Sequence, residues 1–146
     1  MSSLSQWIAP RRPALISIAT GTATWVVAFA VAWRAWPAVT PLAAAGDRLA
    51  YAAELLVGVG VIVLLMVSSC FRVFDTPQAE DPTAGAESAA WKINQRVLSN
   101  TVEQSLIFVP AILALAVRLP PDDLCLLPVL ISLWCAGRIL FWVGYR

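Results

Sequence analysis

The sequence carries, at residues 14 to 33, the run ALISIATGTATWVVAFAVAW, which has no charged residue. Each residue of an α-helix adds about 1.5 Å, so a helix over this run reaches roughly 30 Å, the thickness of the hydrocarbon core of a bilayer. The apolar core of a cleaved signal peptide is only about 7 to 15 residues long. The run therefore predicts a membrane-spanning helix that is retained, with Trp33 as an interfacial anchor at its far end.

Three more apolar segments follow, at about residues 49–74, 92–118 and 124–145. The third of the four spans ends at a double proline, 120–121, because proline cannot continue a helix. Residues 75–90 are polar and rich in turn formers, which is typical of an exposed loop. Its acidic side chains are expected to be solvated charges: Asp75, Glu80, Asp81 and Glu87. We predict an all-α integral membrane protein with four spans.

Composition supports this class. Of 146 residues, 60% are apolar and 13% charged, whereas soluble domains have about 45 to 50% and about 25%. The chain has no histidine, which excludes Ser-His-Asp catalysis and sites where histidine binds zinc or haem. Its three cysteines form no C-x-x-C pair, and a net charge of +1 provides no basic surface for nucleic acid. No metal site is predicted.

Basic residues near the helix ends predict the orientation. Four spans place both termini and the long loop on one side of the membrane. That side has Arg11, Arg12, Arg72, Lys92, Arg96 and Arg146, against Arg34, Arg48 and Arg118 on the other. The positive-inside rule makes the first side cytoplasmic, and the expected location is a cell membrane of the bacterial inner-membrane type.

Polar residues inside the last two spans are the candidate site. An ionisable side chain within a span costs at least about 2.5 to 3.5 kcal/mol on insertion scales, so it normally faces protein or a watery cavity. The residues 96, 100 and 103 follow an i, i+4, i+7 spacing and share one helix stripe, as do 138 and 145 on the last span. With one arginine at the end of the second span, the expected ring consists of Arg72, Arg96, Asn100, Glu103, Arg138 and Tyr145.

This ring supports two interpretations. Guanidinium groups bind carboxylates bidentately and a carboxylate binds an ammonium group, so the ring suits a small zwitterion with excess negative charge. Alternatively, Glu103 and Arg138 pair across the helices as structural contacts, with Asn100 adding an interhelical hydrogen bond.

Two motifs resemble one known family. Arg96 to Gln104 reads RVLSNTVEQ, which is similar to the R-x-x-x-N-x-x-E signature of the membrane-associated proteins in eicosanoid and glutathione metabolism, the MAPEG family. Gly137 to Tyr145 reads GRILFWVGY, similar to that family's later helix, where an arginine precedes a G-Y pair. The resemblance divides the chain into an N-terminal segment (1–13), an extra spanning helix with its loop (14–48) and a MAPEG-like domain (49–146).

The resemblance implies a homotrimer that binds glutathione between subunits near the cytoplasmic face. By analogy, Arg72, Arg96, Asn100 and Glu103 hold the tripeptide, while Arg138 and Tyr145 are the candidates for catalysis. The implied activity is glutathione transfer to lipophilic electrophiles, or reduction of lipid hydroperoxides.

The sequence also departs from the family pattern. Gln104 and Phe141 stand where several active members have tyrosines. Those members carry an activating arginine on a helix after the G-Y pair, and that last helix is expected to be missing here. The alternative is therefore a non-catalytic membrane subunit or lipid-binding scaffold.

Overall fold

The computed structural model describes residues 12–145, which divide after Trp36 into two compact units. The expected N-terminal segment, 1–13, lies almost wholly outside the described residues, as does Arg146. The first unit contains the helix α2, Arg12–Ala35. Two of its hydroxyl groups donate within the helix, from Thr20 to the carbonyl of Ile16 and from Thr24 to that of Thr20, both at 2.9 Å. These bonds satisfy the hydroxyl groups without a neighbouring helix, as a lipid environment requires.

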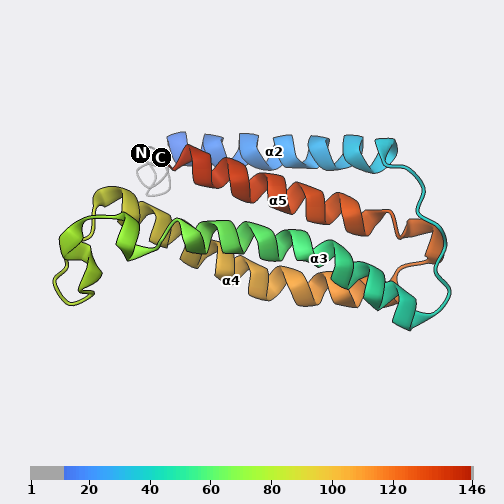
Figure 1. The fold of residues 1–146 in the computed structure, drawn as a ribbon. Coiled ribbons are helices and arrows are strands. Elements are labelled where there is room, and N and C mark those ends of the chain that lie inside the picture. Colours follow the sequence, from blue (N-terminus) through green and yellow to red (C-terminus); the bar gives the residue numbers. More distant parts are fainter. Residues whose placement is uncertain (1–11, 146) are drawn as a thin grey trace, which may run out of the picture. The chain divides into compact units, whose positions relative to one another are not determined.

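The second unit contains three long helices, α3 (Ala45–Ser68), α4 (Ala89–Arg118) and α5 (Leu126–Gly144). In Figure 1, α3 and α4 run side by side, joined at one end by a loop, and α3 also packs against α5. Short 3-10 helices connect them: η2 (Arg72–Phe74), η3 (Pro77–Glu80) and η4 (Pro121–Asp123). The described residues are all helix and loop, and α2, α3, α4 and the segment ending with α5 are each long and apolar enough to cross a membrane. The all-helical, four-span prediction is confirmed.

The helix ends around the long loop differ from the predicted ones. The second span was expected to continue to Phe74, but α3 ends at Ser68. Ser68 and Ser69 donate their hydroxyl groups to backbone carbonyls three residues earlier, at 2.8 and 2.7 Å, and Phe71 adopts extended backbone angles. Because Ser88 caps the next helix by accepting the Trp91 amide at 3.0 Å, α4 begins before Lys92.

The apolar core lies along α3 where it contacts α4 and α5. One cluster includes Ala52 and Val59 of α3 with Ile112 of α4 and Ile131 of α5, and a second joins Met66 to Val97. At the other end of α3, the Arg48 guanidinium donates to the carbonyl of Leu42 at 2.6 Å and to that of Leu119 at 2.8 Å. These bonds tie the start of α3 to the end of α4, so both ends of this helix pair are fixed.

Candidate functional site

The centre of the candidate site is a contact between α4 and α5. The Arg138 guanidinium donates from Nη1 to Oδ1 of Asn100 at 3.1 Å, and the same oxygen lies 3.4 Å from the amide nitrogen of Gln104. The carbon Cζ of Arg138 lies 5.1 Å from the ring centre of Phe141 and 5.8 Å from that of Trp134, within the range of cation-π attraction. Asn100 and Arg138, two residues of the predicted ring, therefore meet.

Arg138 is only partly satisfied by these contacts. Its Nε atom is buried and has no hydrogen-bond partner among the described residues. Within residues 12–145, the one side chain that accepts from it is a neutral amide, and no carboxylate forms an ion pair with it. A half-buried guanidinium of this kind keeps a free donor and an uncompensated charge, which makes it a candidate anion contact.

Helix geometry explains why the α4 stripe is not uniformly buried. Residues of an α-helix follow one another at about 100°, so Arg96 and Glu103 lie about 40 to 60° to one side of Asn100. The buried residues Val97 and Thr101 lie about 60 to 100° to the other side. Asn100 is consequently half-buried at the edge of the contact with α5, whereas Arg96 and Glu103 are exposed in the single chain.

The expected pair between Glu103 and Arg138 is not formed, so that part of the structural interpretation is wrong. Arg138 reaches Asn100 instead, because Glu103 is turned away from α5, and Glu103 has no ion pair with any residue of 12–145. Tyr145 is also exposed, at the end of α5, with its ring 4.9 Å from that of Phe141. Arg96, Glu103 and Tyr145 thus form no hydrogen bond or ion pair with Asn100 or Arg138.

An apolar groove adjoins this contact. It has a volume of about 450 Å³ and is lined by Gln104, Ile107, Phe108, Ala111 and Trp134. The rings of Phe108 and Trp134 stack at 5.3 Å across α4 and α5 and form its floor. Its volume is within the usual range for small-molecule sites, about 300 to 1,000 Å³. The polar contact and a space for an apolar molecule are therefore neighbours.

Arg72, the remaining member of the predicted ring, belongs to a different cluster. Its Nη1 atom forms an ion pair with Glu87 at 2.5 Å and donates to the carbonyl of Ala79 at 3.2 Å, and its Cζ lies 4.4 Å from the ring centre of Trp91. The hydrogen bond from Arg72 lowers the pKa of Glu87. Contrary to expectation, neither Glu87 nor Asp75 is simply solvated, since Asp75 accepts the amide of Ser88 at 2.8 Å.

Asn94 is a polar residue of the site region that was not predicted from the sequence. This side chain, 6% exposed, donates to the carbonyl of Ser69 and accepts from the indole nitrogen of Trp142, both at 3.1 Å. It thereby links α4 to the end of α3 and to α5. The signal was available, because Asn94 is three residues before Val97 and seven before Thr101 and so shares their buried face. A polar residue on that face must find partners inside the protein.

Comparison with known proteins gives one match. The model of the MAPEG family matches residues 49–146, which is about two thirds of the chain. The chain belongs to the MAPEG family. No curated protein and no solved structure matches it. The matched region contains all the candidate residues, and α2 precedes it. Membership makes this an integral membrane protein of a family of glutathione-related transferases and peroxidases.

Proposed function

We propose that this MAPEG protein binds glutathione at the face formed by Asn100 and Arg138 and transfers it to a lipophilic electrophile, or uses it to reduce a lipid hydroperoxide. One observation carries the proposal. The half-buried guanidinium of Arg138 lies next to an apolar groove of about 450 Å³, and its buried Nε donor has no hydrogen-bond partner and its charge no carboxylate partner among residues 12–145. An anionic peptide supplies the missing acceptor, and the groove accepts the apolar reactant.

Arg138 is the proposed thiolate contact. Transfer requires the thiolate, whose sulfur forms a bond to the electrophilic carbon while the leaving group departs with its electron pair and the thiol proton passes to solvent. A free thiol has a pKa near 8.5, and a neighbouring cation lowers it. Because Arg138 and Tyr145 are seven residues apart, about 10 Å along α5, they contact different parts of one tripeptide rather than the same sulfur. Tyr145 is therefore a further polar contact in this proposal.

The exposed charges of α4 complete the proposed binding face in a homotrimer. Arg96 and Glu103 are exposed in the single chain, yet they lie on a helix that is apolar enough to span the bilayer. Exposing an ionised side chain to lipid is costly. In the proposed trimer a second copy covers this side of α4, and Arg96 and Glu103 hold the carboxylate and ammonium ends of the peptide. Arg72 has no part in this site, since its charge is paired with Glu87.

The orientation follows from the basic residues rather than from these contacts. The proposed site opens toward the side that carries the loop between α3 and α4, which the positive-inside rule makes cytoplasmic. Both termini lie on that side of a membrane of the bacterial inner-membrane type.

A non-catalytic membrane subunit is the second candidate, and the Asn100–Arg138 hydrogen bond favours it. This bond closes α4 onto α5 by itself and explains both residues without any ligand. On this hypothesis the groove beside it accommodates lipid, and no thiolate forms.

A titration separates the two. Glutathione is added to the detergent-solubilised full chain while the ultraviolet absorbance of the thiolate is followed, with S-methylglutathione as the thiol-free control. The enzyme proposal expects saturable thiolate formation that is lost in Arg138→Ala and retained in Arg118→Ala, an exposed arginine at the end of α4. Binding without thiolate formation, or no binding, supports the non-catalytic subunit.

A further inference from the structure

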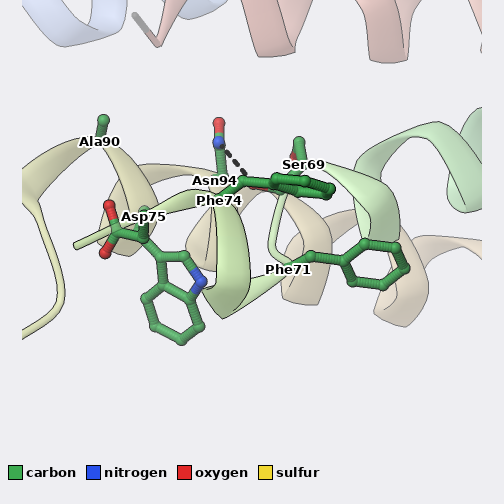
Figure 2. Close-up of a pocket in the computed structure, with 7 residues that line it drawn as sticks. Ser69, Phe71, Phe74, Asp75, Ala90 and Asn94 are labelled. Atoms are coloured by element: carbon green, nitrogen blue, oxygen red, sulfur yellow. Dashed lines mark hydrogen bonds between the residues drawn. The ribbon is translucent and has the colours of Figure 1, made fainter. Parts of the chain in front are cut away.

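A second, smaller pocket lies at the end of α3 and the start of α4. It has a volume of about 140 Å³ and is lined by Ser69, Phe71, Phe74, Asp75, Ala90, Trp91 and Asn94. Figure 2 shows Asp75 on one side of this pocket and Phe71 on the other, with Phe74 and Asn94 between them. It shares no residue with the groove beside Arg138. Its size suits a small polar group rather than a whole substrate.

The side-chain donors that line this pocket already have acceptors inside the chain. The Asn94 amide donates to the carbonyl of Ser69, the Trp91 indole donates to the carbonyl of Cys70 at 2.8 Å, and the Ser69 hydroxyl donates to the carbonyl of Met66. What the lining does offer is three aromatic rings and one carboxylate. Both attract cations, since the face of an aromatic ring carries partial negative charge.

The charge balance also favours a cation. Asp75 is the one charged residue among the seven that line the pocket. Hydrogen bonds from Ser88 hold the pKa of Asp75 below its usual range, so the carboxylate stays ionised at neutral pH. Arg72 lies over the Trp91 ring, but its charge is paired with Glu87. Lys92, the other nearby cation, is exposed and does not line the pocket.

The depth of the pocket points to the lipid headgroups. It begins at Ser69, directly after the last residue of the spanning helix α3. The next apolar side chains are open to the surroundings, with Phe71 49%, Val73 67% and Phe74 79% exposed. Exposed aromatic and aliphatic residues at the end of a span are typical of the membrane interface, where the ammonium groups of zwitterionic lipids lie.

We propose that this pocket binds the ammonium group of a zwitterionic lipid headgroup, held by the rings of Phe71, Phe74 and Trp91 and by the carboxylate of Asp75. The pocket then is a lipid site distinct from the proposed glutathione site. It lies where the loop between α3 and α4 meets the membrane, so a bound headgroup holds that loop against the bilayer surface.

The test compares spin-labelled lipids that differ in the headgroup alone. The full chain is reconstituted in vesicles, and its association with labelled phosphatidylcholine and phosphatidylethanolamine is measured against phosphatidylglycerol of the same acyl chains. The double variant Phe71→Leu/Phe74→Leu keeps the apolar bulk and removes two rings. We expect it to lower the ratio of zwitterionic to glycerol lipid about fivefold to thirtyfold, as the loss of two cation-π contacts implies. Asp75→Asn is expected to lower the same ratio, and Asp75→Glu to retain it.

Matched controls keep the outcome interpretable. Phe29→Leu in α2 and Glu80→Gln in η3 change a phenylalanine and a carboxylate that do not line the pocket, and both are expected to leave the ratio unchanged. Helix content measured by circular dichroism identifies a misfolded variant. If Asp75→Asn misfolds, the double variant Phe71→Leu/Phe74→Leu tests the proposal on its own. A ratio that is the same in wild type, Phe71→Leu/Phe74→Leu and Asp75→Asn overturns the proposal.

A second arm distinguishes lipid from a free cation. Tetramethylammonium chloride is titrated into the detergent-solubilised chain by calorimetry, with sodium chloride at equal ionic strength as the blank. Lipid preference with or without tetramethylammonium binding supports the headgroup site. If tetramethylammonium binding depends on Asp75 but the protein shows no lipid preference, the pocket binds a free cation and the proposed lipid headgroup site is overturned.

Discussion

Arg72 and Arg138 are two half-buried arginines of the same unit, and the structure treats them differently. Arg72 has a carboxylate, a backbone carbonyl and an aromatic ring as partners. In the described part of the chain, Arg138 has one neutral amide and two aromatic rings at longer range as partners, and its buried Nε has none. The charge of Arg72 is therefore satisfied within one chain, whereas that of Arg138 is not matched by any carboxylate of residues 12–145. The difference indicates that Arg138, and not Arg72, is available to bind a ligand.

The contrast extends to the surroundings of each arginine. Beside Arg72, the loop residues Asp75 and Ser88 and the buried Asn94 all have partners inside the chain. Beside Arg138, Arg96 and Glu103 are exposed on a spanning helix. Leaving charges in this state is unfavourable in lipid, which is why the proposed function covers them with a ligand and another copy of the chain.

The largest expected effect is on ligand binding. Arg138→Ala is expected to weaken glutathione binding about 10-fold to 100-fold, because a hydrogen bond to a charged group contributes about 1.5 to 3 kcal/mol. Arg72→Ala is expected to leave the affinity unchanged, since its charge is already paired. Isothermal titration of the two variants measures both. Equal losses at the two arginines would break the comparison.

The next effect is on stability. Asn94→Leu leaves the carbonyl of Ser69 and the indole N–H of Trp142 without this partner, so we expect the free energy of unfolding to fall by about 1 to 3 kcal/mol. Unfolding in detergent, followed by circular dichroism, measures it. Gln78→Leu, on the exposed surface of η3, is the matched control and is expected to be neutral. An unchanged stability of Asn94→Leu contradicts the view that this region is held by internal hydrogen bonds.

A pH titration tests the ion pair between Arg72 and Glu87 in the loop. The pKa of Glu87 is lowered in the folded protein by its hydrogen bond with Arg72, so the stability it contributes is fully present above the unfolded value, about 4.3, and is lost as the pH falls through the lower folded value. We expect the environment of Trp91, which stacks on Arg72, to change in that acid range. The fluorescence difference between wild type and Trp91→Phe reports this change.

Glu87→Gln is the control for the acid transition. It removes the titrating carboxylate, so the Trp91 signal is expected to be altered already at neutral pH and to vary less as acid is added. A transition of the same size in Glu87→Gln assigns it to another group.

The smallest expected effect concerns Thr101. Its hydroxyl is buried and has no partner among the described residues. Thr101→Val removes an unsatisfied polar group and is expected to leave stability unchanged or to raise it by up to about 1 kcal/mol. Thr76→Val, which loses a hydrogen bond to the carbonyl of Ala86, is expected to lower it by about 1 kcal/mol. Thermal unfolding of both variants checks the signs, and a clear loss in Thr101→Val reveals a partner for that hydroxyl.

Much of the fold was predictable because apolar runs of sufficient length have one stable solution in lipid, the helix. The four spans and the MAPEG match followed from such runs and from two local motifs. The helix ends were less predictable, since the end of α3 depends on serine hydroxyl groups that bond the last carbonyls, and an apolar sequence continues to Phe74. Asn94 was missed because it has no charge and its role depends on the partners it meets.

The candidate site was predictable only in part. Spacing placed Arg96, Asn100 and Glu103 on one stripe of α4, which is correct as helix geometry, but even a stripe about 60° wide contains half-buried and exposed positions. Which edge of the stripe faces α5 depends on the packing of α3, α4 and α5. That packing paired Arg138 with Asn100 and left Glu103 exposed.

The sequence alone determined that this protein is embedded in a lipid bilayer, how many times it spans the bilayer and to which family it belongs. These properties depend on the length of apolar runs and on local motifs, which are features of contiguous residues. The tertiary structure decided which polar side chains are satisfied and which are left open. Arg72 and Arg138 are the same residue type and both are half-buried, and only the contacts made across the chain, with Glu87 and with Asn100, distinguish a structural cation from a candidate ligand contact. Such contacts are set by helix rotation and packing, which periodicity does not specify.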